Sequence, residues 1–334
     1  MTVGKLKNET LGEVVFAEID QVRDDILIRP GVGEDCAAIA YGDLACVLTT
    51  DPITGSGSQL GRLAVNVCLN DIASSGAEGV GLLLTLLCPV GTEPHEIQSI
   101  LREANQAAKE LGVEIVGGHT EITDAVNRTI VSATAVGKIK SKELISTSGA
   151  NAGDWLYMTK QVATEGTAII AHDRELELKE VLTEQELQQA KAMMGQISVV
   201  EEGKIGVESG ASAMHDATEG GVLGAIHELC EASDVGCVVF ENQLTLSAIT
   251  QKIARHFDID PFKLISSGTM IVAIDPEKSK AFENRLKTSN IPFSRVGQLT
   301  EDKTKVLAPS VDDFNDGIFV PIGSPESDEL YKVI

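Results

Sequence analysis

The segment Arg62–Ser74 constrains the fold most, because it is apolar and alanine-rich almost throughout. This composition predicts a buried helix rather than a helix on the surface. Asn70 and Asp71 nevertheless lie inside it, and a carboxylate in an apolar helix must be paired, coordinated or neutral. Arg62, Asn66 and Asn70 recur every fourth residue and therefore share one helix face. That polar face serves either a ligand or a contact with another helix.

Composition excludes several classes of protein. The chain has 334 residues, enough for two domains or one large one. Its 27 Lys and Arg against 50 Asp and Glu give a net charge of −23, which argues against binding to nucleic acid or to anionic membranes. Apolar residues make up 43% of the chain, enough for a sizeable core, and aromatic residues only 4%, too few for base-stacking platforms.

The distribution of apolar residues and cysteines predicts a cytoplasmic protein. No run of 18 apolar residues is present, and the first ten residues are polar, so neither a membrane span nor a secretion signal is expected. Six cysteines are scattered through apolar contexts without a CxxC pair. This arrangement favours reduced, buried thiols over a disulfide framework or a zinc site.

Strand-like and helix-like segments alternate along the chain, which is typical of an α/β fold. Strands are expected at 45–50, 80–88 (fully buried), 114–117, 129–139 and 155–159. Helices are expected at 11–22 with Thr10 as the cap, at 62–74, from Pro94 to Gly112, after a Thr183–Glu186 capping box, at 222–230 and after Asp275-Pro276 with Phe282 and Leu286 inward. The polar, turn-rich segment Ser141–Gly153 predicts a boundary between domains at 1–150 and 151–334.

Four aspartates are candidate site residues: Asp35 in a turn before an expected strand, Asp51 where a strand ends, Asp71 on the apolar helix, and Asp216 before a glycine-rich helix start. The simplest interpretation of any one of them is a turn or cap. Together, dispersed carboxylates without a His/Cys cluster suit Mg²⁺ rather than zinc, and Mg²⁺ commonly accompanies a nucleotide phosphate. The chain has neither a GxxxxGK[ST] loop nor a GxGxxG fingerprint, so a P-loop protein is excluded.

The motif VGGHTEIT (Val116–Thr123) follows an expected strand, and we interpret its start as a turn. Gly117 and Gly118 would let the backbone approach a ligand closely. His119 is open to three interpretations: a ligand, an acid or base, or a turn residue with satisfied hydrogen bonds.

Taken in order, six motifs resemble the aminoimidazole ribonucleotide synthetase-like (PurM-like) superfamily. The resemblance runs from about residue 30 to 275, and the motifs are GEDCAAI, TTDPITG, GRLAVNVCLNDIASSGA, VGGHTEIT, MHDATEGGVLGAIHELCEAS and LISSGTMIVAI. Members include the purine enzyme itself, formylglycinamide ribonucleotide amidotransferase, selenophosphate synthetase, thiamine-monophosphate kinase and the hydrogenase maturation protein HypE. The chain most resembles the HypE-like members.

The resemblance implies a two-domain α/β fold and a homodimer. The N-terminal domain would form a β-barrel with its copy, ATP would bind beside that interface, and the C-terminal domain would be an α/β sandwich. Mg²⁺ would be held by the residues at Asp35, Asp51, Asp71 and Asp216, of which Asp71 and Asp216 would also act in catalysis together with His119. The triphosphate would lie near Asn66, Asn70, Gly117, Gly118 and Thr120.

The resemblance also implies an activity, which is transfer of the ATP γ-phosphate to a small or peptide-borne acceptor. HypE carries a cysteine at its extreme C-terminus, whereas the last cysteine here is Cys237; His119 stands where the purine enzyme and the thiamine kinase have an acidic residue. The alternatives are a non-catalytic nucleotide-binding scaffold with a partner in hydrogenase or metalloenzyme maturation, a thiamine-monophosphate kinase, and a selenophosphate synthetase-like enzyme.

Overall fold

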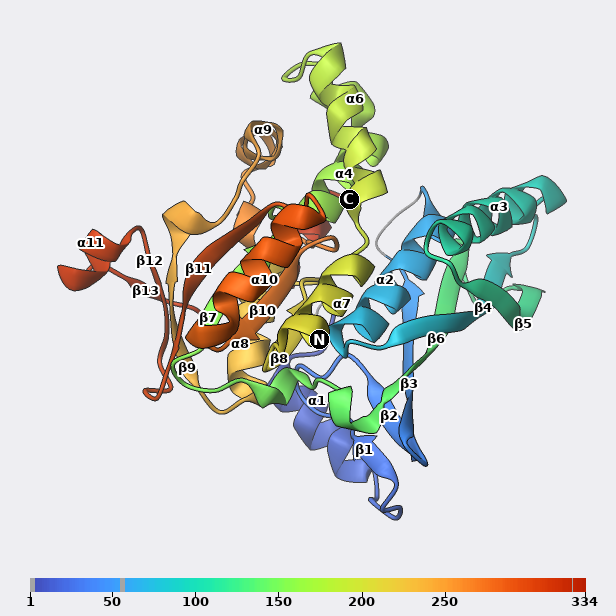
Figure 1. Cartoon of the computed structure of the whole chain (residues 1–334). Helices are drawn as coiled ribbons and strands as arrows, with labels where there is room; N and C mark the ends of the chain where they lie inside the picture. The colour runs from blue at the N-terminus through green and yellow to red at the C-terminus, as the bar shows by residue number, and fades with distance from the viewer. Residues whose placement is uncertain (1–3, 55–57, 326) are drawn as a thin grey trace.

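The computed structural model describes residues 4–54, 58–325 and 327–334. Gly55, the last residue of the TTDPITG motif, lies outside them. The described chain forms two sheets, one from strands between residues 26 and 140 and one from strands between residues 155 and 321 (Figure 1). The turn-rich segment 141–153 connects them and contains two short 3-10 turns. An α/β fold is therefore confirmed.

The N-terminal sheet has six strands in the order β1-β2-β3-β6-β4-β5. All neighbours are antiparallel except β4 and β5, which are parallel, as the intervening helix α3 requires. Helices α2 (Leu60–Ser74) and α3 (Pro94–Glu110) follow β3 and β4. The strands are β1 (Ile26–Ile28), β2 (Ala37–Tyr41), β3 (Leu44–Ile53), β4 (Glu78–Pro89), β5 (Glu114–Thr123) and β6 (Ile130–Lys140).

The C-terminal sheet has seven strands in the order β13-β12-β9-β11-β7-β10-β8. Helices cover both of its faces: Tyr157 and Val272 share a core with residues of α7 and α10, and Leu156 and Ile271 share a core with residues of α8. The strands are β7 (Trp155–Thr159), β8 (Ala213–Asp216), β9 (Gly236–Phe240), β10 (Met270–Ile274), β11 (Phe293–Thr300), β12 (Lys305–Ala308) and β13 (Val320–Pro321). The remaining helices are α1 (Asn8–Val14), α4 (Thr164–Asp173), α5 (Glu175–Leu178), α6 (Glu184–Ala192), α7 (Val200–Ser209), α8 (Gly221–Ala232), α9 (Ala248–Phe257), α10 (Pro276–Thr288) and α11 (Val311–Asn315).

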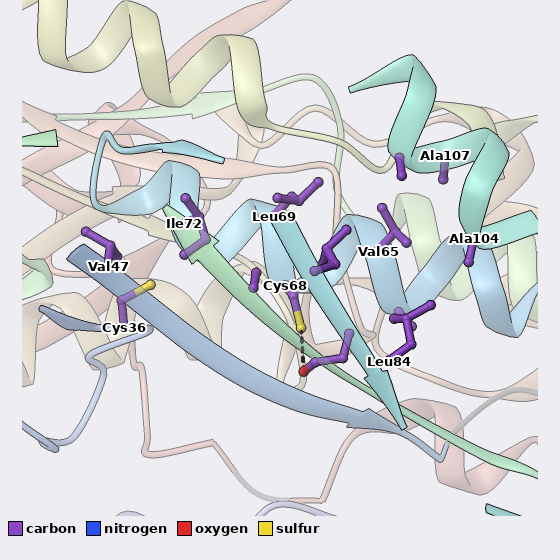
Figure 2. Close-up of a cluster of buried hydrophobic side chains, with 14 of the residues drawn as sticks. Cys36, Val47, Val65, Cys68, Leu69, Ile72, Leu84, Ala104 and Ala107 are labelled. Atoms are coloured by element: carbon purple, nitrogen blue, oxygen red, sulfur yellow. Dashed lines mark hydrogen bonds between the residues drawn. The ribbon is translucent and has the colours of Figure 1, made fainter. Parts of the chain in front are cut away.

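Helix α2 is buried on nearly every side, as its composition predicts. Of its 15 residues, 13 are buried. Cys68, Leu69 and Ile72 pack into the core of the N-terminal sheet, and the Cys68 thiol donates a hydrogen bond of 3.3 Å to the carbonyl of Ala133 (Figure 2). Other parts of the helix contact α3, and α7 and β8 of the C-terminal part (Figure 1). One helix thus connects both parts of the molecule.

Several predicted helix starts are confirmed. Glu93 and Glu96 form a capping box at α3, and Thr183 and Glu186 form the expected one at α6. The Asp275 side chain caps α10, whose Phe282 and Leu286 are buried.

Three local predictions were wrong. The first helix runs only from Asn8 to Val14, with no buried residue, because the apolar residues beyond it find no partner surface. Strand β4 is not fully buried, because no helix covers its second face and Leu83 is 43% exposed. Residues 117–120 lie within strand β5 instead of a turn.

The close packing of α2 on α7 generates a stability prediction. A Cβ atom added at Gly203 in α7 would lie 2.2 Å from the Ala73 carbonyl oxygen of α2, so Gly203→Ala must push the helices apart. We expect a loss of about 1–3 kcal/mol in the free energy of unfolding. Gly195→Ala is the control, since a Cβ there meets nothing within 4 Å. Urea unfolding measures both, and equal stability of the two variants would contradict the prediction.

Candidate functional site

A cavity of about 1140 Å³ lies between the two parts of the molecule. The N-terminal part contributes the loop before β2, the end of β3 and one face of α2, through Asp35, Thr49, Asp51 and Asp71. The C-terminal part contributes residues around the start of α4, the loop before α8 and the last turn of the chain. These residues include Glu165, Thr218, Glu219, Ser267, Asp328 and Tyr331.

Strand β3 and helix α2 bring two of the predicted aspartates together. Thr49 and Asp51 are alternate residues of β3 and therefore point to the same face of the sheet. The Thr49 hydroxyl donates a 2.6 Å hydrogen bond to Asp71 Oδ2, which fixes the orientation of that carboxyl group. The strand runs through Asp51 to Ile53 and does not end at Asp51.

Asp216 completes the group from the C-terminal part. It is the last residue of β8 and fully buried, and neither of its carboxylate oxygens has a hydrogen-bond partner among the described residues. Ligand atoms of Asp216, Asp35 and His215 all lie within 4.8 Å of one another. A buried carboxylate without a donor is costly unless a cation or a proton neutralises it.

His215 is held by carboxylates on both sides. Its Nδ1 lies 2.8 Å from the Asp35 carboxylate and its Nε2 lies 3.2 Å from Glu228 of α8. Burial lowers the pKa of His215, but the charges and hydrogen bonds of Asp35 and Glu228 outweigh it and raise the pKa to about 10. Lys5 Nζ also contacts Glu228, at 3.2 Å. His215 thus positions Asp35, because both of its ring nitrogens are already engaged.

The four aspartates act on one another electrostatically. Burial raises the pKa of Asp71 well above its ordinary value, and the charges of Asp51, Asp216 and Asp35 raise it further. Burial and the charges of Asp35 and Asp51 likewise raise the pKa of Asp216, although His215 opposes this. Clustered carboxylate oxygens, two of them without a donor, fit a hard divalent cation such as Mg²⁺.

The predicted site residues other than the four aspartates are not among the described residues that line the cavity. They are Asn66, Asn70, Gly117, Gly118, His119 and Thr120. The Asn70 side chain donates to the Ile197 carbonyl and accepts from the Val199 amide, both at 2.8 Å, so it joins α2 to the segment before α7. The Asn66 amide donates to the Arg62 carbonyl of its own helix. In the described chain the polar face of α2 therefore makes contacts within the protein.

The Gly-Gly motif lies on the edge strand β5. A Cβ atom on Gly118 would lie 1.9 Å from the Leu84 carbonyl oxygen, so the close approach that this glycine allows is that of strand β4. His119 is exposed and contacts Glu121 at 3.1 Å, and Thr120 is also exposed. The structure does not bring Gly117, Gly118, His119 or Thr120 to the four aspartates within one chain.

Sequence reasoning missed Thr49, Glu228 and Lys5 and gave His215 no role. His215 and Glu228 both lie in the quoted motif MHDATEGGVLGAIHELCEAS, and His215 directly precedes Asp216. The sequence did not show that β8 contacts α8, which brings the two side chains together. Lys5 carries no local signal, because its partner is 223 residues away. Cys36, beside Asp35, is disfavoured as a nucleophile, because burial and the charges of Asp71 and Asp35 raise the pKa of its thiol.

Fold and site together define a two-part α/β protein with a carboxylate-rich cavity between its parts. Residues 33–139 match the N-terminal domain of AIR synthase related proteins, and residues 151–308 match their C-terminal domain. The chain therefore belongs to the AIR synthase related family, as its motifs predict.

Relatives and solved structures agree with this membership. A protein of Methanocaldococcus jannaschii named for hydrogenase expression and formation is 27% identical over 83% of this chain and 82% of its own. A selenide, water dikinase of Haemophilus influenzae is 26% identical over 88% of this chain and 91% of its own. The HypE–HypF complex structure matches at a TM-score of 0.76 and 21% identity, covering 94% and 99% of the two chains. A HypE structure with ATP matches at 0.69 and 17%, covering 100% and 98%.

Within the described residues, none of the helices has the length and apolar character that crossing a membrane requires.

The unpartnered carboxylate of Asp216 generates a prediction for the metal-free protein. Folding raises the pKa of this carboxyl group above its ordinary value of 3.8. Its charged form is therefore disfavoured in the folded protein, and the free energy of unfolding falls as the pH rises above 3.8. Asp216→Asn keeps the shape and removes this charge, so we expect it to raise the free energy of unfolding by about 1–3 kcal/mol near pH 8, and by less as the pH falls toward about 4.

Urea unfolding of both proteins in a chelator, repeated with Mg²⁺, tests this. Mg²⁺ should stabilise the wild type more than Asp216→Asn. A variant less stable than the wild type in chelator at every pH would contradict the prediction.

Proposed function

We propose that the chain is a Mg²⁺-dependent, ATP-binding enzyme that transfers the ATP γ-phosphate to a small or peptide-borne acceptor. The observation that carries the proposal is the group of Asp35, Asp51, Asp71 and Asp216, of which the first three line a cavity of about 1140 Å³ and the last is fully buried behind them. The volume suffices for a nucleotide together with a second ligand. The relative named selenide, water dikinase and the HypE structure with ATP support nucleotide use.

The four aspartates would hold the cation. When bound, Mg²⁺ would neutralise charge on the phosphate oxygens, which is the main requirement of phosphoryl transfer. Thr49 keeps Asp71 in one orientation, and His215 does the same for Asp35. These contacts preorganise the carboxylates, so little rearrangement is needed when the cation and nucleotide enter.

The basic residues of the cavity would contact the phosphates. Among the described lining residues these are Lys5 and Arg128. Arg128 is exposed, and Lys5 is engaged by Glu228 at 3.2 Å. We assign Arg128 to phosphate binding because its guanidinium group is charged at all relevant pH values and matches phosphate geometry.

We also propose a homodimer formed through the face of the N-terminal sheet that no helix covers, with residues 1–150 as the dimerisation and ATP/Mg²⁺-binding domain and residues 151–334 as the second domain. Its strands expose Val80, Leu83 and Val116, each by 43–63%. Exposed apolar patches of this kind mark protein contacts. Gly117–Thr120 lie on the same edge, so a dimer would place His119 at the interface, close to the partner's nucleotide.

The metal assignment predicts the effect of Asp71→Asn. Loss of this carboxylate should weaken Mg-ATP binding at least about tenfold, as expected for a group that contacts the metal. Isothermal titration of ATP into dialysed protein, with and without Mg²⁺, measures this. Asp24→Asn, on an exposed turn, is the control and should bind as the wild type does. Unchanged Mg-ATP affinity in folded Asp71→Asn would refute the metal assignment.

The dimer assignment predicts that Leu83→Glu produces a monomer. A charge in the centre of an apolar contact is left desolvated and unpaired, so association should weaken by more than about a hundredfold. Sedimentation velocity measures the change. Leu176→Glu, at an apolar residue that is 84% exposed on α5, should leave the dimer intact. A wild-type chain that sediments as a monomer would overturn the assignment.

A further inference from the structure

A group of exposed apolar residues lies at the end of the C-terminal sheet, on α11 and β13. Val311, Ile318, Phe319 and Val320 are each exposed by 46–57%. Phe314 belongs to the same group, because its ring lies 5.7 Å from that of Phe319 and Val311 precedes it by one turn of α11. We call these five residues the apolar edge. They lie at the end of the molecule opposite α3 (Figure 1).

Aromatic side chains are concentrated at this edge. The whole chain has only 8 Phe, 3 Tyr and 1 Trp, yet three of the phenylalanines stack here. Phe314 contacts Phe319 on one side and Phe240 of β9 on the other, with 6.4 Å between the second pair of ring centres. The Ile318 amide donates a 2.8 Å hydrogen bond to the Asp313 carbonyl, which holds the turn between α11 and β13. Aromatic side chains that are fixed in place and partly exposed are typical of the centre of protein interfaces.

The surroundings of the apolar edge are acidic. Residues 306–321 include three aspartates and no Lys, Arg or His. Two of these aspartates, Asp312 and Asp316, are exposed. The lysines that precede the segment contact other acids: Lys303 contacts Asp234, and Lys305 Nζ lies 2.9 Å from Glu231 of α8. The edge therefore combines exposed apolar surface with negative charge.

This charge decides between the candidate occupants of the edge. A second copy would bring Asp312 and Asp316 against the same residues, and an anionic membrane would bring lipid phosphates against them, so like charges would oppose both contacts. Pairing with an additional strand is limited as well. The outermost described strand, β13, is only two residues long, and its Pro321 has no N–H to donate. A basic protein segment that binds through side chains meets none of these obstacles.

We propose that the apolar edge is a docking surface for another protein, and that this partner presents a basic segment with apolar side chains. The apolar side chains of the partner pack on Phe314 and Phe319, and its Lys or Arg side chains meet Asp312 and Asp316. An apolar centre with a polar rim is the usual anatomy of a specific interface. No residue of the edge is among the described residues that line the cavity, so this proposal is independent of the nucleotide function.

Selection of peptides on the full chain tests the proposal. A phage-displayed library of random peptides is selected on immobilised wild-type protein at physiological salt, and the selected peptides are synthesised with a fluorescent label. We expect them to combine Lys or Arg with aliphatic or aromatic residues. Their affinity, measured by fluorescence anisotropy, should fall at least about tenfold in Phe319→Ser, because a central aromatic contact is lost.

Matched variants separate the edge from the general negative charge of the chain. Leu176→Ser removes a side chain that is 84% exposed on α5, and it should change peptide affinity by less than about twofold. Asp316→Lys should weaken binding about fivefold or more, whereas Asp24→Lys, on the exposed turn before β1, should have less than about a twofold effect because salt screens distant charges. Val320→Ser repeats the test at a side chain that is 57% exposed, where Phe319→Ser fails to fold.

The contrary outcomes are distinct from one another. Peptides that bind Phe319→Ser and Val320→Ser as tightly as the wild type, or that carry no net positive charge, overturn the proposal. A sedimentation coefficient of the wild type that rises with concentration, and no longer does so in Phe319→Ser, would assign the edge to a second copy instead. Cosedimentation with vesicles of anionic lipid that the same variant abolishes would assign it to a membrane.

Discussion

The burial of helix α2 is the constraint on which the rest of the structure depends. The helix fills the space between the N-terminal sheet and the C-terminal part, and Asn70 ties it to the backbone at Ile197 and Val199. Because no face of the helix is left for solvent, Asp71 is carried into the interior with it. The position of this carboxylate is therefore fixed by packing, and β3, β8 and the loop at Asp35 are arranged around it.

This arrangement brings four carboxylates together in the interior of the protein, where an uncompensated charge is most costly. Hydrogen bonding and a buried imidazole offset part of the penalty, through Thr49 at Asp71 and His215 at Asp35. Asp216 receives no such help from the described residues. Active sites commonly retain strain of this type, because groups that would stabilise the empty protein would compete with the ligand.

The sequence predicted correctly those features that depend on neighbouring residues. It failed for features that depend on which distant segments pair or pack together in the fold. The composition of α2 and the capping box at Thr183 needed only neighbouring residues. The open face of β4 and the strand conformation of Gly118 depend on which strands pair and on which helices cover them. The four aspartates could be chosen by type and motif, but the contact of Lys5 with Glu228 joins residues 223 positions apart and has no local signal.

The thiols of the chain have a consequence for how its motions can be observed. Five of the six cysteines are buried, and burial raises the pKa of Cys36 and Cys68, so neither forms a reactive thiolate in the closed protein. Cys36 and Cys68 both lie in the core around α2. Cys36 also lines the cavity, whereas Cys68 is fully buried. Alkylation of Cys68 must therefore wait for the core to open, and its rate reports how often α2 separates from its sheet.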